Sequence, residues 1–263
     1  MYSEEHKRFI RKKKITSMLV HLLQVLLIVS LIVIWELLAK YEVINTFISS
    51  SPSRIVNTII KLYNDGNLFN HIWTTVYETL ISFGIGTLIG IVVAIILWYS
   101  NFLYRIFDPY LTIINSLPKV AIGPIIIIYF GANIKSIIIM ALLISVIVTI
   151  ITVYNGFIST DQNRINLLKS FKASKRQIFR YAILPSSYPT IISSLKINIS
   201  MTLIGVIMGE FLVSKEGIGY LITYGSQVFN LNLVMSGIVI LLIVSYLMYL
   251  IVSYIEKILI KND

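Results

Sequence analysis

Six long apolar stretches constrain this chain more than any other feature of its sequence. They run over approximately residues 18–39, 72–98, 109–130, 134–154, 190–213 and 233–255. Each is long enough to cross a bilayer as a helix, which takes about 20 residues. Within a bilayer every backbone polar group must be satisfied inside the protein, so such stretches fold as helices. The sequence therefore predicts an all-α polytopic membrane protein with six transmembrane helices.

Composition supports a membrane protein. Apolar residues make up 57% of the chain and charged residues 13%, with a mean hydropathy of +0.85. Soluble domains have about 45–50% apolar and about 25% charged residues. The first stretch follows basic residues, as in a signal peptide, but it is long, and its end around Trp35-Glu36 has no small-residue cleavage site. We expect an uncleaved helix. The absence of cysteine excludes disulfides and Cys-ligated metals.

The positive charges lie unevenly along the chain. The segments that alternate spans place on one side carry 15 of the 22 Lys and Arg residues, and those on the other side carry 5. Cytoplasmic loops are the basic ones, so both termini and the loop 156–189 are expected to be cytoplasmic. This topology accounts for the net charge of +10 without nucleic-acid binding. The expected organisation is a basic cytoplasmic N-terminus (1–17), a first transmembrane helix (18–39), an external linker (40–71), a transmembrane core (72–256) and a cytoplasmic tail (257–263).

Two connecting segments have local signals of their own. In the external linker, Ser51 and Pro52 are typical of a helix start, so we expect an amphipathic helix over residues 54–63. The residues 64–67, Asn-Asp-Gly-Asn, form a turn signal. Residues 101–108 are expected to form a short inner turn.

Two groups of residues are candidates to line a pathway. Prolines at membrane depth free backbone groups, so Pro118 and Pro124, with Lys119 beside them, favour a helix that faces protein or water. The alternative is a plain kink with Lys119 extending to the interface. The second group forms one polar or small face of the fifth stretch and comprises Asn198, Thr202, Gly205 and Gly209, with Glu210 near the outer end. Glu78 is expected to point into the protein or a wet cavity.

The stripe of small residues in the second stretch has a structural interpretation. Gly86, Gly90 and Ala94 are four residues apart, which gives one smooth helix face. Packing within the chain is favoured over a contact between two copies.

Several kinds of chemistry are missing from the sequence. There is no G-x-x-x-x-G-K-[ST] phosphate loop, and His6, His21 and His71 have no metal-ligand neighbour at helical spacing. No Ser/His/Asp grouping stands out, so an enzyme is not expected. A secondary transporter or channel remains an alternative, although it would be expected to show functional intramembrane charges or an internal repeat.

The basic loop 156–189 is expected to hold two short amphipathic helices joined by a tight turn, and it resembles the cytoplasmic "EAA" coupling loop of importer-type ABC permeases. The pattern of that loop is E-A-A, three residues, G, nine residues, then I-x-L-P. The corresponding residues here are Asn166-Leu167-Leu168, Lys172 and Ala182-Ile183-Leu184-Pro185. The register and the Leu-Pro end match, whereas the Glu, both Ala and the Gly do not. Lys at the Gly position means either a different turn or a strained residue.

Two further segments resemble the nitrate/sulfonate/taurine-type permeases. The run from Ser116 to Pro124, followed by Phe130-Gly131, is similar to their P-x-x-A-x-x-P…FG segment. Gly209-Glu210-Phe211, followed by residues 217–220 (Gly-Ile-Gly-Tyr), is similar to their E-F…G-L-G-Y segment.

The resemblance implies a type-I ABC importer permease in a bacterial plasma membrane. It implies a cytoplasmic ATPase dimer that binds ATP-Mg, an extracellular solute-binding protein and a second permease chain, with no cofactor on this chain. The second chain is either another copy or a related permease, and a homodimer is favoured over a heterodimer. The substrate would be a small anion of the nitrate, sulfonate or taurine type, or a vitamin precursor. An energy-coupling-factor scaffold also docks ATPases, but its Ala-Arg-Gly motifs are absent. The residues implied in ATPase coupling are Asn166, Leu167, Leu168, Phe171, Lys172, Ala173, Ser174, Lys175, Arg176, Leu184 and Pro185. The helix is expected over residues 166–172, with Leu167, Leu168 and Phe171 as apolar anchors.

Overall fold

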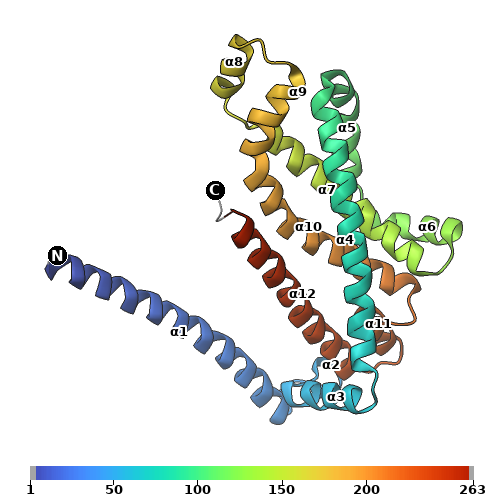
Figure 1. The fold of residues 1–263 in the computed structure, drawn as a ribbon. Helices are drawn as coiled ribbons and strands as arrows, with labels where there is room; N and C mark the ends of the chain where they lie inside the picture. Colours follow the sequence, from blue (N-terminus) through green and yellow to red (C-terminus); the bar gives the residue numbers. More distant parts are fainter. Residues whose placement is uncertain (1–3, 261–263) are drawn as a thin grey trace.

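The computed structural model describes residues 4–260, with side chains described from residue 13 (Figure 1). Residues 1–3 of the predicted N-terminal segment and 261–263 of the predicted tail lie outside the described residues. Every regular element in the described range is a helix, which confirms the all-α prediction. In chain order they are α1 (Glu4–Lys40), α2 (Thr46–Ser49), α3 (Pro52–Asn64), α4 (Leu68–Tyr99), α5 (Asn101–Ser116), η1 (Lys119–Ile122), α6 (Gly123–Phe130), α7 (Ile134–Ile158), α8 (Gln162–Ser170), α9 (Lys175–Ile178), η2 (Phe179–Ile183), α10 (Leu184–Val213), α11 (Ile218–Gln227) and α12 (Leu231–Ile260).

Five helical segments are long and apolar enough to cross a membrane: Lys13–Lys40 of α1, α4, α7, the run Lys175–Val213 that contains α10, and α12. The third predicted stretch is different, because α5 and the η1–α6 segment meet at an angle of 91°. If this bent pair counts as one span, the described chain has six. The bend falls where Leu117 is extended, and a residue before proline disfavours the helical conformation.

The prediction of a short inner turn over residues 101–108 is wrong. These residues form the first half of α5. Ser100 caps the helix, because its hydroxyl accepts the N–H of Leu103 at 3.3 Å. Pro109 lies inside the helix rather than at its start.

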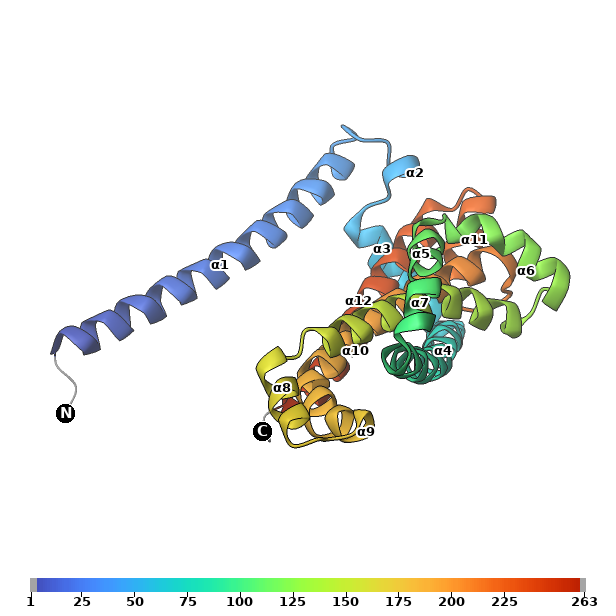
Figure 2. The same ribbon diagram turned by 90° about the horizontal axis from the view of Figure 1, so that it is seen from above.

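The centre of the bundle is α7, which packs between α4 and α10 (Figures 1 and 2). Small residues allow this close approach. A Cβ atom at Gly86 would lie 2.6 Å from Ser145 Oγ, and one at Gly90 would lie 2.5 Å from Thr149 Cβ. The stripe of small residues on α4 therefore packs within the chain, as the sequence favours.

The two ends of the bundle differ. Figure 1 shows α8 and α9 at one end and α2, α3 and α11 at the opposite end. As predicted, α3 begins with Ser51, whose hydroxyl accepts the N–H of Arg54 at 3.4 Å, and Pro52. The long helix α1 leaves the bundle near α3 and extends away from it (Figure 2), so its apolar side chains are largely exposed.

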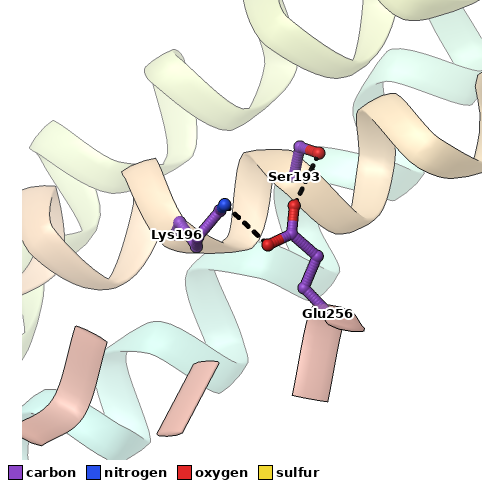
Figure 3. A network of polar contacts seen from close by, with 3 residues as sticks. All are labelled: Ser193, Lys196 and Glu256. Atoms are coloured by element: carbon purple, nitrogen blue, oxygen red, sulfur yellow. Dashed lines mark hydrogen bonds and ion pairs between the residues drawn. The ribbon is translucent and has the colours of Figure 1, made fainter. Parts of the chain in front are cut away.

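The last helix is joined to α10 by a polar network (Figure 3). The Lys196 ammonium lies 2.6 Å from Glu256 Oε2, and the Ser193 hydroxyl donates to Glu256 Oε1 at 2.9 Å. Lys196 and Ser193 lie one turn apart on α10, so both reach the one carboxylate on α12.

Candidate functional site

The first helix of the basic loop, α8, has a capped N-terminus. Oδ1 of Asp161 accepts the N–H of Asn163 at 2.9 Å. The helix therefore starts at Gln162, four residues before the predicted start at Asn166, because Asp161 satisfies an N–H group that the first turn leaves free. It ends at Ser170, so Phe171 and Lys172 belong to the turn that follows.

The turn after α8 has the geometry that glycine normally provides. Lys172 has a φ of 56°, in the left-handed region. Its N–H donates to the carbonyl of Lys169 at 2.8 Å, and the N–H of Ala173 donates to the carbonyl of Leu168 at 3.0 Å. This pair of bonds is the Schellman helix ending. Of the two possibilities left open by the sequence, the structure shows a strained Lys172 in the turn that glycine would serve.

The second helix of the loop starts immediately after this turn. Ser174 and Gln177 form a capping box, in which Ser174 Oγ accepts the N–H of Gln177 and Gln177 Oε1 accepts the N–H of Ser174. From Lys175 the chain stays helical through the π turn η2 into α10. Leu184 and Pro185 thus start α10 inside a continuous helical run. Pro185 has no N–H for a backbone bond, which fits a widened turn directly before it.

The apolar residues of the loop separate into two sets. Ile165, Leu168 and Ala173 are half-buried and pack against the buried cluster that contains Ile178 and Phe179. In contrast, Leu167 is 58% exposed and Phe171 is 75% exposed. Leu168 therefore faces the chain's own helices, which argues against its predicted role as an outward anchor. In α8 and the turn after it, Leu167 and Phe171 are the two large apolar side chains that project from the surface.

The basic residues also divide. Lys175 reaches the end of α4, where its Nζ donates to the carbonyl of Tyr99 at 2.9 Å and lies 5.4 Å from the centre of the Trp98 ring. Arg164 donates to Ser186 Oγ at 3.2 Å, across the loop. Arg176, Asn166 and Lys172 are exposed. A groove of about 610 Å³ separates α8 from the ends of α4 and α7, with Lys169 and Lys175 on its wall.

The first group of predicted pathway residues lies at the bend between α5 and α6. Pro118 and Pro124 are exposed, and Lys119 is half-buried. Lys119 Nζ donates to the carbonyl of Asn115 at 2.9 Å, so its side chain folds back over the last turn of α5. Gly123 is buried, and a Cβ atom there would lie 2.5 Å from Leu212 Cδ1. The contact between Gly123 and Leu212 therefore fixes the bend to α10, whereas Pro118 and Pro124 stay exposed.

The second group lies between helices of the same chain. Asn198 Nδ2 donates to Thr87 Oγ1 on α4 at 2.6 Å, and Thr202 Oγ1 donates to the carbonyl of Asn198 at 2.8 Å. Gly205 and Gly209 lie against the backbone of Ala141 and Ile137 on α7. All four are buried within the chain. Their polar and small face serves helix packing here, and a role in the pathway stays a prediction.

Glu78 and Glu210 come together at the end of the bundle opposite the basic loop. Their carboxyl groups lie within hydrogen-bonding reach of each other. Oε1 of Glu210 accepts the hydroxyl of Thr75 at 2.6 Å, and Oε2 accepts the N–H of Gly219 at 2.5 Å. Sequence reasoning proposed both glutamates separately and missed Thr75. The spacing of Thr75 and Glu78 on one face of α4 is the signal that could have joined them.

Comparison with known proteins identifies the family. Residues 86–261 match the family described as "Binding-protein-dependent transport system inner membrane component". The chain belongs to this family. An ABC transporter permease of Haemophilus influenzae is 30% identical to this permease over 234 residues, covering 88% of this chain and 94% of the relative. The aliphatic sulfonates transport permease SsuC of Bacillus subtilis is 26% identical over 231 residues, covering 88% and 84%.

A solved structure confirms the fold of this permease. A chain of the inward-facing MetNI methionine ABC transporter aligns with a TM-score of 0.63 and 20% identity, covering 72% of the permease and 94% of that chain. The family and the fold agree with the resemblance seen in the basic loop. The protein is therefore a multi-pass ABC importer permease, a class that works with ATPase and binding-protein partners.

Most of the permease's candidate residues could be named from the sequence, but the directions in which their side chains point could not. Spacing placed Leu167, Leu168 and Phe171 on one amphipathic segment. In the structure the helix ends at Ser170, Leu168 faces the bundle, and Leu167 and Phe171 face outward. Among the described side chains, those of residues 13–260, no group of three or more His, Cys, Asp and Glu residues is arranged to hold a metal ion.

Proposed function

We propose that the basic loop of this permease is the docking site for a cytoplasmic ATPase. The observation that carries the proposal is the exposure of Leu167 on the capped helix α8 and of Phe171 in the turn after it, on a basic surface. Large apolar side chains that project from a polar surface are typical of contact anchors. Asn166, Lys172 and Arg176 lie exposed beside them as polar contacts. Leu168, Ala173 and Lys175 hold the loop against the bundle, and Ser174 caps the start of α9.

The transport cycle follows from the way the loop is joined to the bundle. ATP-Mg bound between the two ATPase subunits would close the ATPase dimer and move α8. Because Ile165 and Leu168 pack on the bundle, and because Leu184 and Pro185 continue the helical run, that movement reaches α10. The bundle then shifts between inward-open and outward-open states, whose populations ATP binding changes. The chain itself supplies no nucleotide site in this scheme.

The pathway requires a second permease chain. We place a second copy of this chain beside the bend of α5 and α6, where Pro118, Lys119 and Pro124 face away from the chain's own core. A homodimer is proposed over a heterodimer. Both termini and the basic loop are proposed to be cytoplasmic, in agreement with the distribution of Lys and Arg. The membrane would be the bacterial plasma membrane.

The substrate class is proposed from the relatives. The Bacillus subtilis relative is named for aliphatic sulfonates, and the segments around Pro118 and Glu210 resemble the nitrate/sulfonate/taurine type. A small anion of this kind, or a vitamin precursor, would be delivered to the outer face by an extracellular binding protein. The family assignment favours this function over a secondary transporter or channel.

The docking proposal is tested with Leu167→Asp and Phe171→Asp in a tagged, full-length permease purified from its native membrane. We expect each variant to insert normally and to lose most of the co-purified ATPase. Phe229→Asp is the matched control, because Phe229 is 74% exposed and lies after α11 at the opposite end. Retention of the ATPase by both loop variants would contradict the proposed anchors. Mass spectrometry of the unaltered complex, with a sulfonate binding assay on any recovered binding protein, tests the substrate class.

A further inference from the structure

Two carboxyl groups face each other in a site with almost no access to solvent. Glu78 on α4 is 2% exposed and Glu210 on α10 is 1% exposed. The two groups lie within hydrogen-bonding reach. Carboxylate oxygens only accept hydrogen bonds, so two ionised groups cannot bond to each other. Contact between these side chains therefore requires a proton on one of them.

The hydrogen-bond donors around the pair are unequal. Glu210 accepts the hydroxyl of Thr75 on one oxygen and the N–H of Gly219 on the other. Thr75 Oγ1 in turn accepts the N–H of Ile218 at 2.8 Å, which directs the hydroxyl proton toward Glu210. Glu78 Oε2 is buried and has no partner among the described residues. Donors stabilise the ionised form of a carboxyl group, and their absence favours the neutral form. The proton therefore belongs on Glu78.

The neighbouring elements supply no positive charge to replace that proton. On α4, His71 Nδ1 accepts the N–H of Gly217 at 3.0 Å, so this ring nitrogen carries no proton. On α11, the ring of Tyr220 stacks on His71. In the loop before α11, Lys215 and Glu216 are exposed. The buried polar side chains on α7 are Ser136, Ser145 and Thr149, and on α12 the one is Ser236.

We propose that Glu78 and Glu210 form a proton-binding site that holds α4, α10 and α11 together. Glu78 carries the proton and donates it to Glu210, whose remaining acceptor positions fix the start of α11. One turn along α4 from Glu78, Ser82 Oγ is also buried without a partner, which extends the polar site along this face. The inference goes beyond the proposed docking function and does not depend on it.

The proton also determines the shape of the segment before α11. Gly217 has a φ of 104°, and a Cβ atom there would meet the Glu210 carboxyl group. At Gly219 a Cβ atom would lie 2.7 Å from Glu210 Oε2. The backbone of this segment thus lies directly against the Glu210 carboxyl group. Loss of the proton would leave two negative charges in contact, and the start of α11 would be the first part released.

The test is infrared spectroscopy of the full-length permease in lipid nanodiscs. A protonated buried carboxyl group has a C=O stretch distinct from that of a carboxylate. We expect this band in the wild-type protein at pH 7, its loss in Glu78→Gln and its disappearance at alkaline pH. The Gln amide can donate to Glu210 in place of the proton, so this variant is expected to fold. An equal band in the wild-type protein and in Glu78→Gln would overturn the proposal.

Thermal unfolding gives an independent measurement. A solvated Glu is ionised above about pH 5, so unfolding would release the bound proton, and the wild-type stability would fall as the pH rises. One such proton lowers the unfolding midpoint by about 2–4 °C per pH unit in a chain of this size. Glu78→Gln should have a smaller slope between pH 5.5 and 7.5, and Glu216→Gln, at an exposed glutamate, should keep the wild-type slope. Equal slopes in the wild-type protein and Glu78→Gln would contradict the proton site.

Discussion

The Nζ atom of Lys196 on α10 lies 2.6 Å from Oε2 of Glu256 on α12. It is the polar link between the last helix and the centre of the bundle, and Ser193 adds a hydrogen bond to the same carboxylate. At its other end, α12 accepts a hydrogen bond from Ser50 Oγ on Asn232 Oδ1 at 2.8 Å, and its Ser236 hydroxyl donates to the carbonyl of Ile55 at 3.3 Å. Toward α10, the pair of Lys196 and Glu256 favours one position of α12 along that helix.

Glu256→Gln tests this link. We expect a lower unfolding midpoint, because the ammonium of Lys196 loses its counter-charge in a partly buried position. The measurement is thermal unfolding of the purified permease, together with the exchanged pair Lys196→Glu/Glu256→Lys. If the exchanged pair recovers none of the lost stability, the ion pair does not set the register.

Lys172→Gly should stabilise the permease by about 1 kcal/mol, because an L-residue in the left-handed region carries a penalty of about 1–2 kcal/mol that glycine does not. Unfolding in denaturant measures the change. The control is Lys169→Gly inside α8, which should destabilise by about 1 kcal/mol. A loss of coupled ATPase activity in Lys172→Gly, without a loss of stability, would show that the Lys172 side chain makes a contact of its own.

Gly205→Ala should destabilise the bundle by about 1–3 kcal/mol. The new Cβ atom would lie 2.5 Å from the Cα atom of Ala141, and backbone at that position cannot move away cheaply. Gly84→Ala is the matched control, because nothing lies within 4 Å of its Cβ position and alanine favours a helix by about 0.5–1 kcal/mol. The two variants should therefore shift the unfolding midpoint in opposite directions, and an unchanged or higher midpoint in Gly205→Ala would argue against the tight contact.

Ser174→Ala should cost about 1 kcal/mol, because the capping box at the start of α9 loses the acceptor for the N–H of Gln177. Hydrogen exchange at residues 175–178 measures the effect locally. Faster exchange in this segment, with unchanged exchange in α7, is the expected result. Ser170→Ala is the comparison, since its hydroxyl donates only to the carbonyl of Leu167 on the exposed end of α8.

The fold class and the family could be predicted from sequence because apolar length and motif order are local properties. The bend at Leu117-Pro118 was anticipated from the proline, but its angle depends on how Gly123 packs against Leu212. The prediction of a turn at the start of α5 was wrong, although Ser100 is a residue type typical of a helix cap. Side-chain direction was the hardest property to predict. Leu167 and Leu168 are neighbours in sequence, yet Leu167 faces solvent and Leu168 faces the core.

The association of Glu78 with Glu210 could not be derived from sequence, because the two residues lie on different helices. Each alone suggested a polar group at the edge of the membrane. Only the packing of α4 on α10 brings them together. The Thr75 hydroxyl completes the cluster, because it donates to Glu210 and accepts the N–H of Ile218 at the start of α11. The basic loop was easier, since its helices, turn and cap lie within one continuous segment.

The unbroken helical run from Lys175 to Val213 has a mechanical consequence. Its 39 residues measure about 58 Å along the helix axis at 1.5 Å per residue, so one continuous helical run connects the basic loop with the buried glutamate at the far end. A movement of α9 would therefore reach α10 without crossing a non-helical joint. The π turn at Phe179–Ile183 is the place where the run could gain or lose one residue of register. Such a slip would rotate the face that α10 presents to α7 while leaving the loop in place.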